Sequence, residues 1–332
     1  MTTLRTISHP LLLALLLLTV SPPALAFDLA AGDLLVVMRS PARVLKVDRV
    51  TGAQTVLSSG GELHLPIAVT VAPGALLVSD AFTPSIVEIA TPGGTQTVLS
   101  TGQDLDTPTG LSVDGPDLLV ANLTPAVFAS QVLRISLATG GQSVLSQVSS
   151  PSRVGAVTVG SPGAIYVVDE IAGSVSSVDP VSGALAHISS GNLLVGPIGI
   201  AVEASGQLVV ADASGLVLRV DPLTGAQTQL ASGGNLVTPF GIAVEADGHL
   251  VITDKGTDKL VRIDPATGVQ TVVSSFSTDP WGVAVVAGDP SAAPGPIPAL
   301  PGRMYTVGLL AALGLTFVVL ARRLHRAPAS LR

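Results

Sequence analysis

The sequence predicts an all-β protein, and its composition and turn residues both support this fold class. Hydrophobic residues make up 47% of the 332 residues, which is enough to bury a sizeable core. Aromatic residues make up only 3%, so we expect a core of Val, Leu, Ile and Ala, in which the abundant Val favours strands. The 35 Gly and 25 Pro residues supply frequent turns. Away from the two ends of the chain, no segment keeps a 3.6-residue apolar period.

One phrase recurs six times and divides the chain into units. Two of its copies read VDPLTGAQTQLASG (220–233) and IDPATGVQTVVSSF (263–276). Its turn glycine returns at intervals of 42 to 46 residues, at Gly52, Gly94, Gly140, Gly183, Gly225 and Gly268. A period of this length with several strands per unit is typical of propeller blades. The sequence therefore predicts a six-bladed β-propeller over residues 27–287.

Each unit divides into four alternating segments, which predicts four-stranded blades. In the last full copy the expected strands are 241–246, 249–254, 259–264 and 269–275. A further strand, WGVAVV (281–286), has no blade of its own. We expect it to pair with DLLVVM (33–38) and close the ring, because an open propeller exposes unpaired strand edges. The alternative takes FDLAAG (27–32) as the first strand and leaves the C-terminal strand extra.

The clearest units resemble a known group of propellers. The segments GIAVEASGQLVVADASGLVLRVD (199–221) and GIAVEADGHLVITDKGTDKLVRID (241–264) are similar to NHL-repeat and gluconolactonase-like six-bladed β-propellers. The resemblance extends over residues 30–287 and implies the fold. It leaves the function open, because such propellers include hydrolases, lyases and binding modules.

The N-terminus has the pattern of a secretory signal peptide over residues 1–26. Arg5 precedes an apolar stretch from Leu11 to Val20, and the small-residue site Ala24-Leu25-Ala26 follows. We expect cleavage after Ala26, with an uncleaved anchor as the alternative.

The C-terminus predicts a membrane anchor. Residues 304–321 are uncharged and mostly apolar, and as a helix they would be about 27 Å long, enough for a transmembrane helix. A Pro/Ala/Gly-rich linker (288–303) precedes this helix, and a basic tail (322–332) follows that we expect to be cytoplasmic. With IPALP (297–301), the segment resembles the PEP-CTERM and IPTL-CTERM sorting signals of Gram-negative bacteria. The propeller is then expected in the periplasm or at the cell surface.

Charge and cysteine content exclude several classes of function. The net charge of −7 argues against a nucleic acid partner, since phosphate binding needs a basic face. Without cysteine, the protein has no disulfide, no thiolate metal site and no cysteine nucleophile. No oligomeric state is predicted.

Acidic and amide side chains recur where the second strand of a blade ends. They are Asp80, Asn122, Asp169, Asp212 and Asp254, with Met38 in the first blade. They would either form a ring around a cation or accept backbone N–H groups of the hairpins they open. We favour the hairpin role, because a residue repeated in every blade meets a need of every blade. The series Asp48, Asp179, Asp221 and Asp264 is assigned to turns for the same reason.

Departures from the repeat are the better candidates for a site. Calcium-dependent gluconolactonases bring acids and amides together on one metal in the channel. No cofactor is expected for a binding module. For the alternative, a calcium-dependent hydrolase, the resemblance implies Asn122, Asp169, Glu203 and Glu245 as ligands of a Ca²⁺ ion.

Histidine and tryptophan are scarce and add little to this choice. His64, His187 and His249 are scattered outside the two terminal segments, so neither a zinc site nor the histidine base of a lyase is expected. The only tryptophan, Trp281, begins the closing strand and is assigned to the core or to ring closure. The insertion LTPAVFASQ (123–131) is either a binding loop or a plain extension.

These observations predict a binding or scaffolding module for a protein or glycan partner, anchored in the membrane by its C-terminal helix. The alternative is a calcium-dependent, lactonase-like hydrolase with acids in the central channel. A lyase is the third possibility, which the poor histidine supply disfavours.

Overall fold

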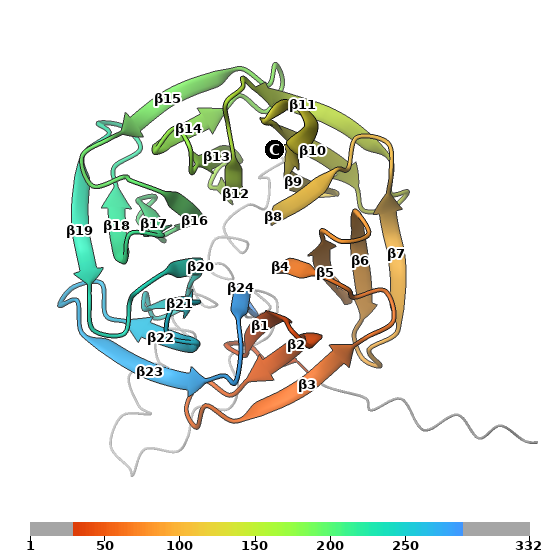
Figure 1. Ribbon diagram of the computed structural model, residues 1–332, viewed down its shortest axis with the longest axis horizontal. Helices are drawn as coiled ribbons and strands as arrows, with labels where there is room; N and C mark the ends of the chain where they lie inside the picture. Colours follow the sequence, from red (N-terminus) through yellow and green to blue (C-terminus); the bar gives the residue numbers. More distant parts are fainter. Residues whose placement is uncertain (1–28, 288–332) are drawn as a thin grey trace, which may run out of the picture. The chain divides into compact units, whose positions relative to one another are not determined.

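The computed structural model describes residues 29–287, which form six four-stranded antiparallel sheets arranged around a central axis (Figure 1). The predicted all-β, six-bladed β-propeller is therefore confirmed. The predicted signal peptide (1–26), linker (288–303), transmembrane helix (304–321) and basic tail (322–332) lie outside these residues. No helix in the described part has the length and apolar character that crossing a bilayer requires.

Blade 1 joins the two ends of the propeller. Its strands, from the channel outward, are β24 (Pro280–Val285), β1 (Leu34–Arg39), β2 (Ala42–Val47) and β3 (Gln54–Ser59). Leu34 pairs with Val285 and Met38 with Pro280, in antiparallel register. The predicted closure by the C-terminal strand is thus confirmed, and the alternative with FDLAAG as first strand is wrong. Closure leaves every innermost strand paired, which removes the sheet edges an open ring would expose.

The other blades follow the chain order from the channel outward. Blade 2 has β4 (Pro66–Ala72), β5 (Ala75–Asp80), β6 (Ser85–Ala90) and β7 (Gln96–Thr101). Blade 3 has β8 (Thr107–Asp114), β9 (Asp117–Thr124), β10 (Ala129–Ser136) and β11 (Gln142–Val148), with the short 3₁₀ helix η1 (Pro125–Val127) between β9 and β10. Blade 4 has β12 (Val154–Gly160), β13 (Ala164–Asp169), β14 (Ser174–Val178) and β15 (Leu185–Ser190).

The last two blades are the most regular. Blade 5 has β16 (Pro197–Val202), β17 (Leu208–Asp212), β18 (Leu216–Val220) and β19 (Gln227–Ser232). Blade 6 has β20 (Pro239–Val244), β21 (Leu250–Asp254), β22 (Lys259–Ile263) and β23 (Gln270–Ser275). The expected strands of this blade differ from the observed ones by at most two residues at either end.

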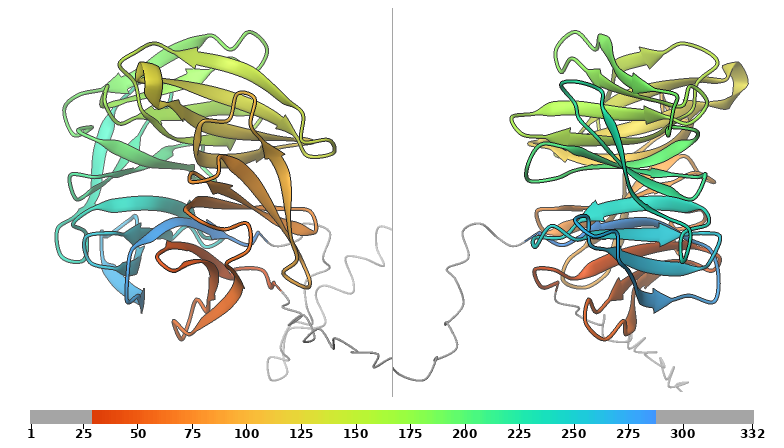
Figure 2. Two further views of the ribbon diagram at one scale, coloured as in Figure 1. Left: turned by 45° about the vertical axis from the view of Figure 1, so that its right-hand side comes forward. Right: turned by 90° about the vertical axis from the view of Figure 1, so that its left-hand side faces the viewer.

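The propeller has two distinct faces, and the right-hand view of Figure 2 shows it edge-on between them. In blade 5, Pro197 at the start of β16 pairs with Asp212 at the end of β17. We call face A the face on which innermost strands begin and second strands end, and face B the opposite one. Face A therefore carries the hairpins between second and third strands and the connections between blades. Both ends of the propeller meet on face B, where the N–H of Gly32 donates to the carbonyl of Val286 at 2.8 Å.

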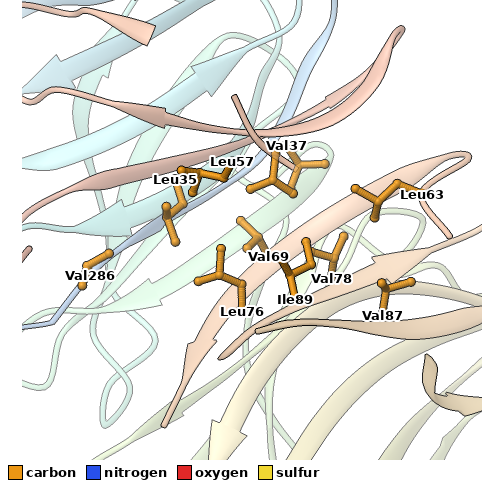
Figure 3. Packing of buried hydrophobic residues seen from close by; sticks show 11 residues of the cluster. Leu35, Val37, Leu57, Leu63, Val69, Leu76, Val78, Val87, Ile89 and Val286 are labelled. Carbon is orange, nitrogen blue, oxygen red and sulfur yellow. The ribbon is translucent and has the colours of Figure 1, made fainter. Parts of the chain in front are cut away.

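The core consists of aliphatic clusters packed between neighbouring blades. Between blades 1 and 2, Leu35 and Leu57 pack with Val69, Leu76 and Ile89 (Figure 3). All five side chains are buried. Alternation along each strand directs one set of residues to each neighbour, so every blade depends on two others.

The recurring phrase of the sequence also fastens neighbouring blades together. Ser189, in the outermost strand of blade 4, donates its hydroxyl to the carbonyl of Gly225 in blade 5 at 2.7 Å. The amide of Gln227 donates to the same hydroxyl at 2.9 Å. Equivalent contacts join Ser100 of blade 2 to Gly140 and Gln142 of blade 3. The Gly, Gln and Ser of the phrase thus have a role between blades as well as within the turn.

Candidate functional site

The side chains that end the second strands tie two loops of face A together. Asp212 is fully buried, and its Oδ2 accepts the N–H groups of Val195 at 2.9 Å and Gly196 at 3.0 Å. Its Oδ1 accepts the N–H of Ser214 at 2.9 Å. Asp80, Asp169 and Asp254 also accept backbone N–H groups from the interblade connection and from the hairpin that follows. The predicted hairpin role is confirmed. The oxygens of these carboxylates accept hydrogen bonds from backbone N–H groups.

Asn122 replaces the aspartate in blade 3 for a local reason. Its Oδ1 accepts the N–H groups of Asp106 at 3.0 Å and Thr107 at 3.1 Å. Its Nδ2 donates to the carbonyl of Asp104 at 2.8 Å. The insertion after β9 extends the hairpin, so the side chain meets a carbonyl in place of turn N–H groups. An amide, which both accepts and donates, satisfies this position where a carboxylate would not.

Glu203 and Glu245 are held in ion pairs within their own blades. Both oxygens of Glu203 accept from Arg219, at 2.7 Å from Nε and 2.6 Å from Nη2. This hydrogen bonding raises the pKa of Arg219 above its ordinary value. Glu245 makes the same two-pronged pair with Arg262, whose Nη1 also donates to the carbonyl of Arg49 in blade 1 at 3.1 Å. These arginines lie on the third strands and reach across the second strands.

The four residues proposed as calcium ligands lie on opposite faces of the propeller. Asn122 and Asp169 end second strands on face A, whereas Glu203 and Glu245 follow innermost strands on face B. A strand of five or six residues separates the faces by roughly 17–20 Å. Within residues 29–287, no three His, Cys, Asp or Glu side chains form a group suited to a metal ion. The calcium set thus gains no support from the structure, because these four residues do not converge.

The central channel is narrow and uncharged. Its cavity has a volume of about 80 Å³ and is lined by the six innermost strands. A Cβ on Gly110 would lie 2.5 Å from the Cα of Ala156, which shows how closely neighbouring strands approach. The lining residues are Gly, aliphatic residues, Thr109 and Phe240, without a carboxylate or an imidazole. Acids expected in the channel of a hydrolase are therefore not among its lining.

Two cations and two aromatic rings meet where the channel opens on face A. The guanidinium carbon of Arg39 lies 3.9 Å from the centre of the Trp281 ring, and the Nζ of Lys255 lies 3.6 Å from it. Lys255 is also 4.9 Å from the ring centre of Phe240, and the two rings are 4.4 Å apart. We call these four residues the mouth cluster.

The fold of blades 1 and 6 brings the mouth cluster together. Arg39 directly follows Met38 in blade 1, and Lys255 directly follows Asp254 in blade 6. Met38 and Asp254 occupy the same position near the end of the second strand. Phe240 and Trp281 are the second residues of the innermost strands β20 and β24. Since these blades are neighbours only after ring closure, the cluster depends on the seam.

The mouth cluster carries charge in a half-buried setting. Burial lowers the pKa of Lys255 below its ordinary value, while Asp279 opposes this and Arg39 adds to it. Burial also lowers the pKa of Arg39, again against Asp279. Neither cation has an ion-pair partner within 4.0 Å among residues 29–287. The Nε of Arg39 and the Nε1 of Trp281 are buried donors without an acceptor.

Several exposed apolar side chains lie on the loops of face A. They are Phe82, Val127, Phe128, Ile171, Val195 and Val237. Phe82 is 70% exposed and Phe128 is 68% exposed. Phe128 lies in the insertion of blade 3, for which the sequence left two interpretations open, a binding loop or a plain extension. A large aromatic side chain in water is unfavourable unless a partner covers it.

The three histidines of the propeller lie apart. His64 stacks on Phe82 on face A, with ring centres 5.9 Å apart. His187 is in the outer strand β15, and His249 lies beside Asp247 in an exposed turn of face B. The histidine base of a lyase was not expected, and none of these side chains lines the channel.

The mouth cluster was missed by reasoning from the sequence, although Trp281 does belong to the closing strand as expected. A signal was present in the aligned blades. At the position after the second strand, the other blades have Ala81, Leu123, Glu170 and Ala213, so only blades 1 and 6 carry cations there. The same two blades are the ones with an aromatic second residue in the innermost strand.

Comparisons with known proteins identify the fold and no family. No family model matches the sequence, and no curated protein matches it. Among solved structures, a chain of a nidogen/laminin complex is similar, with a TM-score of 0.64 and 18% identity over 77% of this chain and 98% of that one.

Two lyases are also similar in structure. A streptogramin B lyase matches with a TM-score of 0.59 and 14% identity, over 77% of this chain and 88% of that one. A virginiamycin B lyase from Staphylococcus aureus matches with a TM-score of 0.56 and 16% identity, over 77% and 89%. At these identities the likeness shows a shared six-bladed propeller and does not transfer an activity.

Proposed function

We propose that this protein is an exported, membrane-anchored β-propeller of the NHL-repeat type that binds a protein partner through face A. The observation that carries the proposal is the set of exposed apolar side chains on face A, foremost Phe82 and Phe128. Phe82 and Phe128 depart from the repeat, so these two side chains serve no common need of the blades. Aromatic side chains are enriched at protein–protein interfaces relative to the rest of the surface.

Two further points support a binding role over hydrolysis. The channel lining lacks the carboxylates that a metal-dependent hydrolase needs. One structurally similar chain is part of a nidogen/laminin complex, so a propeller of this shape takes part in protein binding elsewhere. Export and anchoring rest on the terminal segments of the sequence, which resemble a signal peptide and a sorting signal with a transmembrane helix.

Site-specific crosslinking in the native host tests the proposal. A photoreactive amino acid is placed at Phe82 or Phe128 on face A, and in matched controls at Val181 or Leu223. These control positions are 92% and 94% exposed, on hairpins of face B. We expect one defined protein adduct from face A and none from face B. Equal labelling from both faces would refute the proposal, and a glycan adduct would replace the protein partner by a glycan.

The hydrolase alternative has its own readout. After removal of divalent ions by a chelator, the melting temperature is followed as calcium is added back, together with hydrolysis of a model lactone. A binding module is expected to show neither a calcium-dependent shift nor turnover. A saturable shift accompanied by lactone hydrolysis would favour the calcium-dependent enzyme instead.

A further inference from the structure

We propose that the mouth cluster binds one carboxylate group of the partner, placed between Arg39 and Lys255 and against Trp281. This inference rests on the proposed function and deepens it, because it names the chemistry recognised at the centre of face A.

The two cations of the cluster share one aromatic ring. Arg39 and Lys255 lie 3.9 Å and 3.6 Å from the centre of Trp281. Each is stabilised by a cation–π contact, but two like charges on one indole repel each other. Throughout the described propeller no carboxylate pairs with either of them, so an anion from outside would relieve the repulsion.

The hydrogen-bonding capacity of the cluster points to the same ligand. The Nε of Arg39 and the Nε1 of Trp281 are buried donors with no acceptor, and Trp281 itself is only 8% exposed. A buried donor without a partner is unfavourable, because it has lost its hydrogen bond to water. A guanidinium offers parallel N–H groups that match the two oxygens of a carboxylate. Since both donors are covered, a small rearrangement of Arg39 accompanies binding.

The local charge balance favours a monoanion. Arg153 and Glu170 both act on Lys255 electrostatically and neutralise each other, with Nη1 and Oε2 3.1 Å apart. Of the remaining groups that act on Lys255, Arg39 is positive and Asp279 is negative. The mouth therefore has an excess of one positive charge in a protein with a net charge of −7. A carboxylate matches this excess, whereas a phosphate dianion exceeds it.

The surroundings favour a carboxylate on an apolar body. The side chain of Phe240 forms part of the channel lining next to Lys255. Val237, which is 54% exposed, lies beside the Lys255 hairpin, since a Cβ on Gly256 would be 2.6 Å from it. The C-terminus of a protein, or an acidic side chain with an apolar neighbour, has both features.

The cluster contains its own reporter, because Trp281 is the only tryptophan of the chain. The full-length protein is titrated with N-acetylphenylalanine while tryptophan fluorescence is recorded at constant ionic strength. N-acetylphenylalaninamide, which lacks the charge, and inorganic phosphate are titrated in parallel. We expect a saturable change with the acid only. No saturable change with the acid, an equal change with the amide, or tighter binding of phosphate would each overturn the proposal.

Variants separate binding from packing. Lys255→Met and Arg39→Met are expected to weaken binding of the acid at least tenfold. Lys259→Met is the matched control, because Lys259 lies on the same hairpin but donates to Asn235 at 2.9 Å, away from Trp281. If the first two variants bind the acid as tightly as the parent and melt at the same temperature, the two cations pack on the Trp281 ring and do not bind the carboxylate.

The two levels of the hypothesis fail in different ways. If crosslinks from Phe82 and Phe128 persist while the acid has no effect on fluorescence, face A binds a partner without this carboxylate contact. If the acid binds but no face A crosslink forms, the anion site stands and the protein-binding role falls.

Discussion

The hydroxyl of Ser274, in the outermost strand of blade 6, donates a 2.8 Å hydrogen bond to the carbonyl of Gly52 in blade 1. The amide of Gln54 donates to the same hydroxyl at 2.9 Å. The seam that closes the ring therefore has the same fastening as the internal boundary between blades 4 and 5. In sequence these partners are more than 200 residues apart, so the contact forms only when the ring is complete.

Gly52→Ala tests how tightly this seam is packed. At Gly52, φ is +70° and a Cβ would lie 2.0 Å from the carbonyl oxygen of Val273. Gly74 is the matched control, with φ of +77° and open space around its Cβ position. In urea unfolding we expect a loss of about 1 kcal/mol for Gly74→Ala, from the backbone alone, and about 3 kcal/mol or more for Gly52→Ala. Equal losses would show that the neighbouring blade yields without strain.

The two glutamate–arginine pairs are expected to differ in their contribution to stability. The side chain of Glu245 is 1% exposed and that of Glu203 is 11% exposed. Glu245→Gln leaves Arg262 without its charged partner and should lower the free energy of unfolding by about 3 kcal/mol. Glu203→Gln should lower it by about 1–2 kcal/mol, since water reaches the remaining guanidinium more easily. Calcium should change neither value. If calcium raised the free energy of unfolding of the parent and of neither variant, that result would support the metal hypothesis.

The hairpin aspartates are expected to make stability depend on pH in acid. Backbone N–H groups of Leu223 and Thr224 lower the pKa of Asp221 below its ordinary value of 3.8. A carboxylate with a lowered pKa in the folded state stabilises the fold above 3.8, and this gain is lost as pH falls through the folded pKa. Asp221→Asn keeps an acceptor but no charge. We expect the parent to melt above this variant at pH 7 and the difference to close in stronger acid; a constant difference would contradict the mechanism.

Lys255→Met is expected to stabilise the propeller slightly at neutral pH. Burial lowers the pKa of Lys255, so the folded state disfavours the charge while the unfolded state accepts it. This unfavourable contribution is present below the lowered pKa and vanishes as pH rises to the ordinary value of 10.5. The gain should stay well under ~1 kcal/mol, because the group is half exposed and its aromatic contacts act in the opposite direction. A loss of stability larger than that of Lys259→Met would show that Lys255 serves packing first.

Much of the fold follows from local sequence patterns. The interval between turn glycines predicted the blades, and the need to pair an orphan strand predicted that β24 joins β1. The expected third strand of blade 6 covered 259–264, and the observed one is Lys259–Ile263. The turn glycine recurs in all six blades, so each copy supports the assignment of the others.

The candidate site could not be predicted in the same way, because its residues come from different blades and the pattern within one repeat does not show that they meet. The mouth cluster joins Arg39 and Trp281, which are far apart in sequence and share one ring contact only through closure. Glu203 and Glu245 stood out as departures from the repeat, yet the arginines that pair with them occupy the third strands of the same blades. Assigning each residue to a face would have shown that the four proposed calcium ligands do not converge, because both glutamates lie on face B while Asp169 and Asn122 lie on face A.

The closing pair also determines how the ring responds to mechanical load. β1 begins and β24 ends on face B, and the chain enters and leaves the propeller there, beside the Gly32–Val286 contact. A force that draws these two ends apart would act on one end of the antiparallel pair and break its hydrogen bonds one after another, as a zipper opens. A pull between a partner on face A and the chain beyond residue 287 would instead run along β24 and load many bonds at once. The same strand is therefore a weak link in one direction of pull and a strong one in the other.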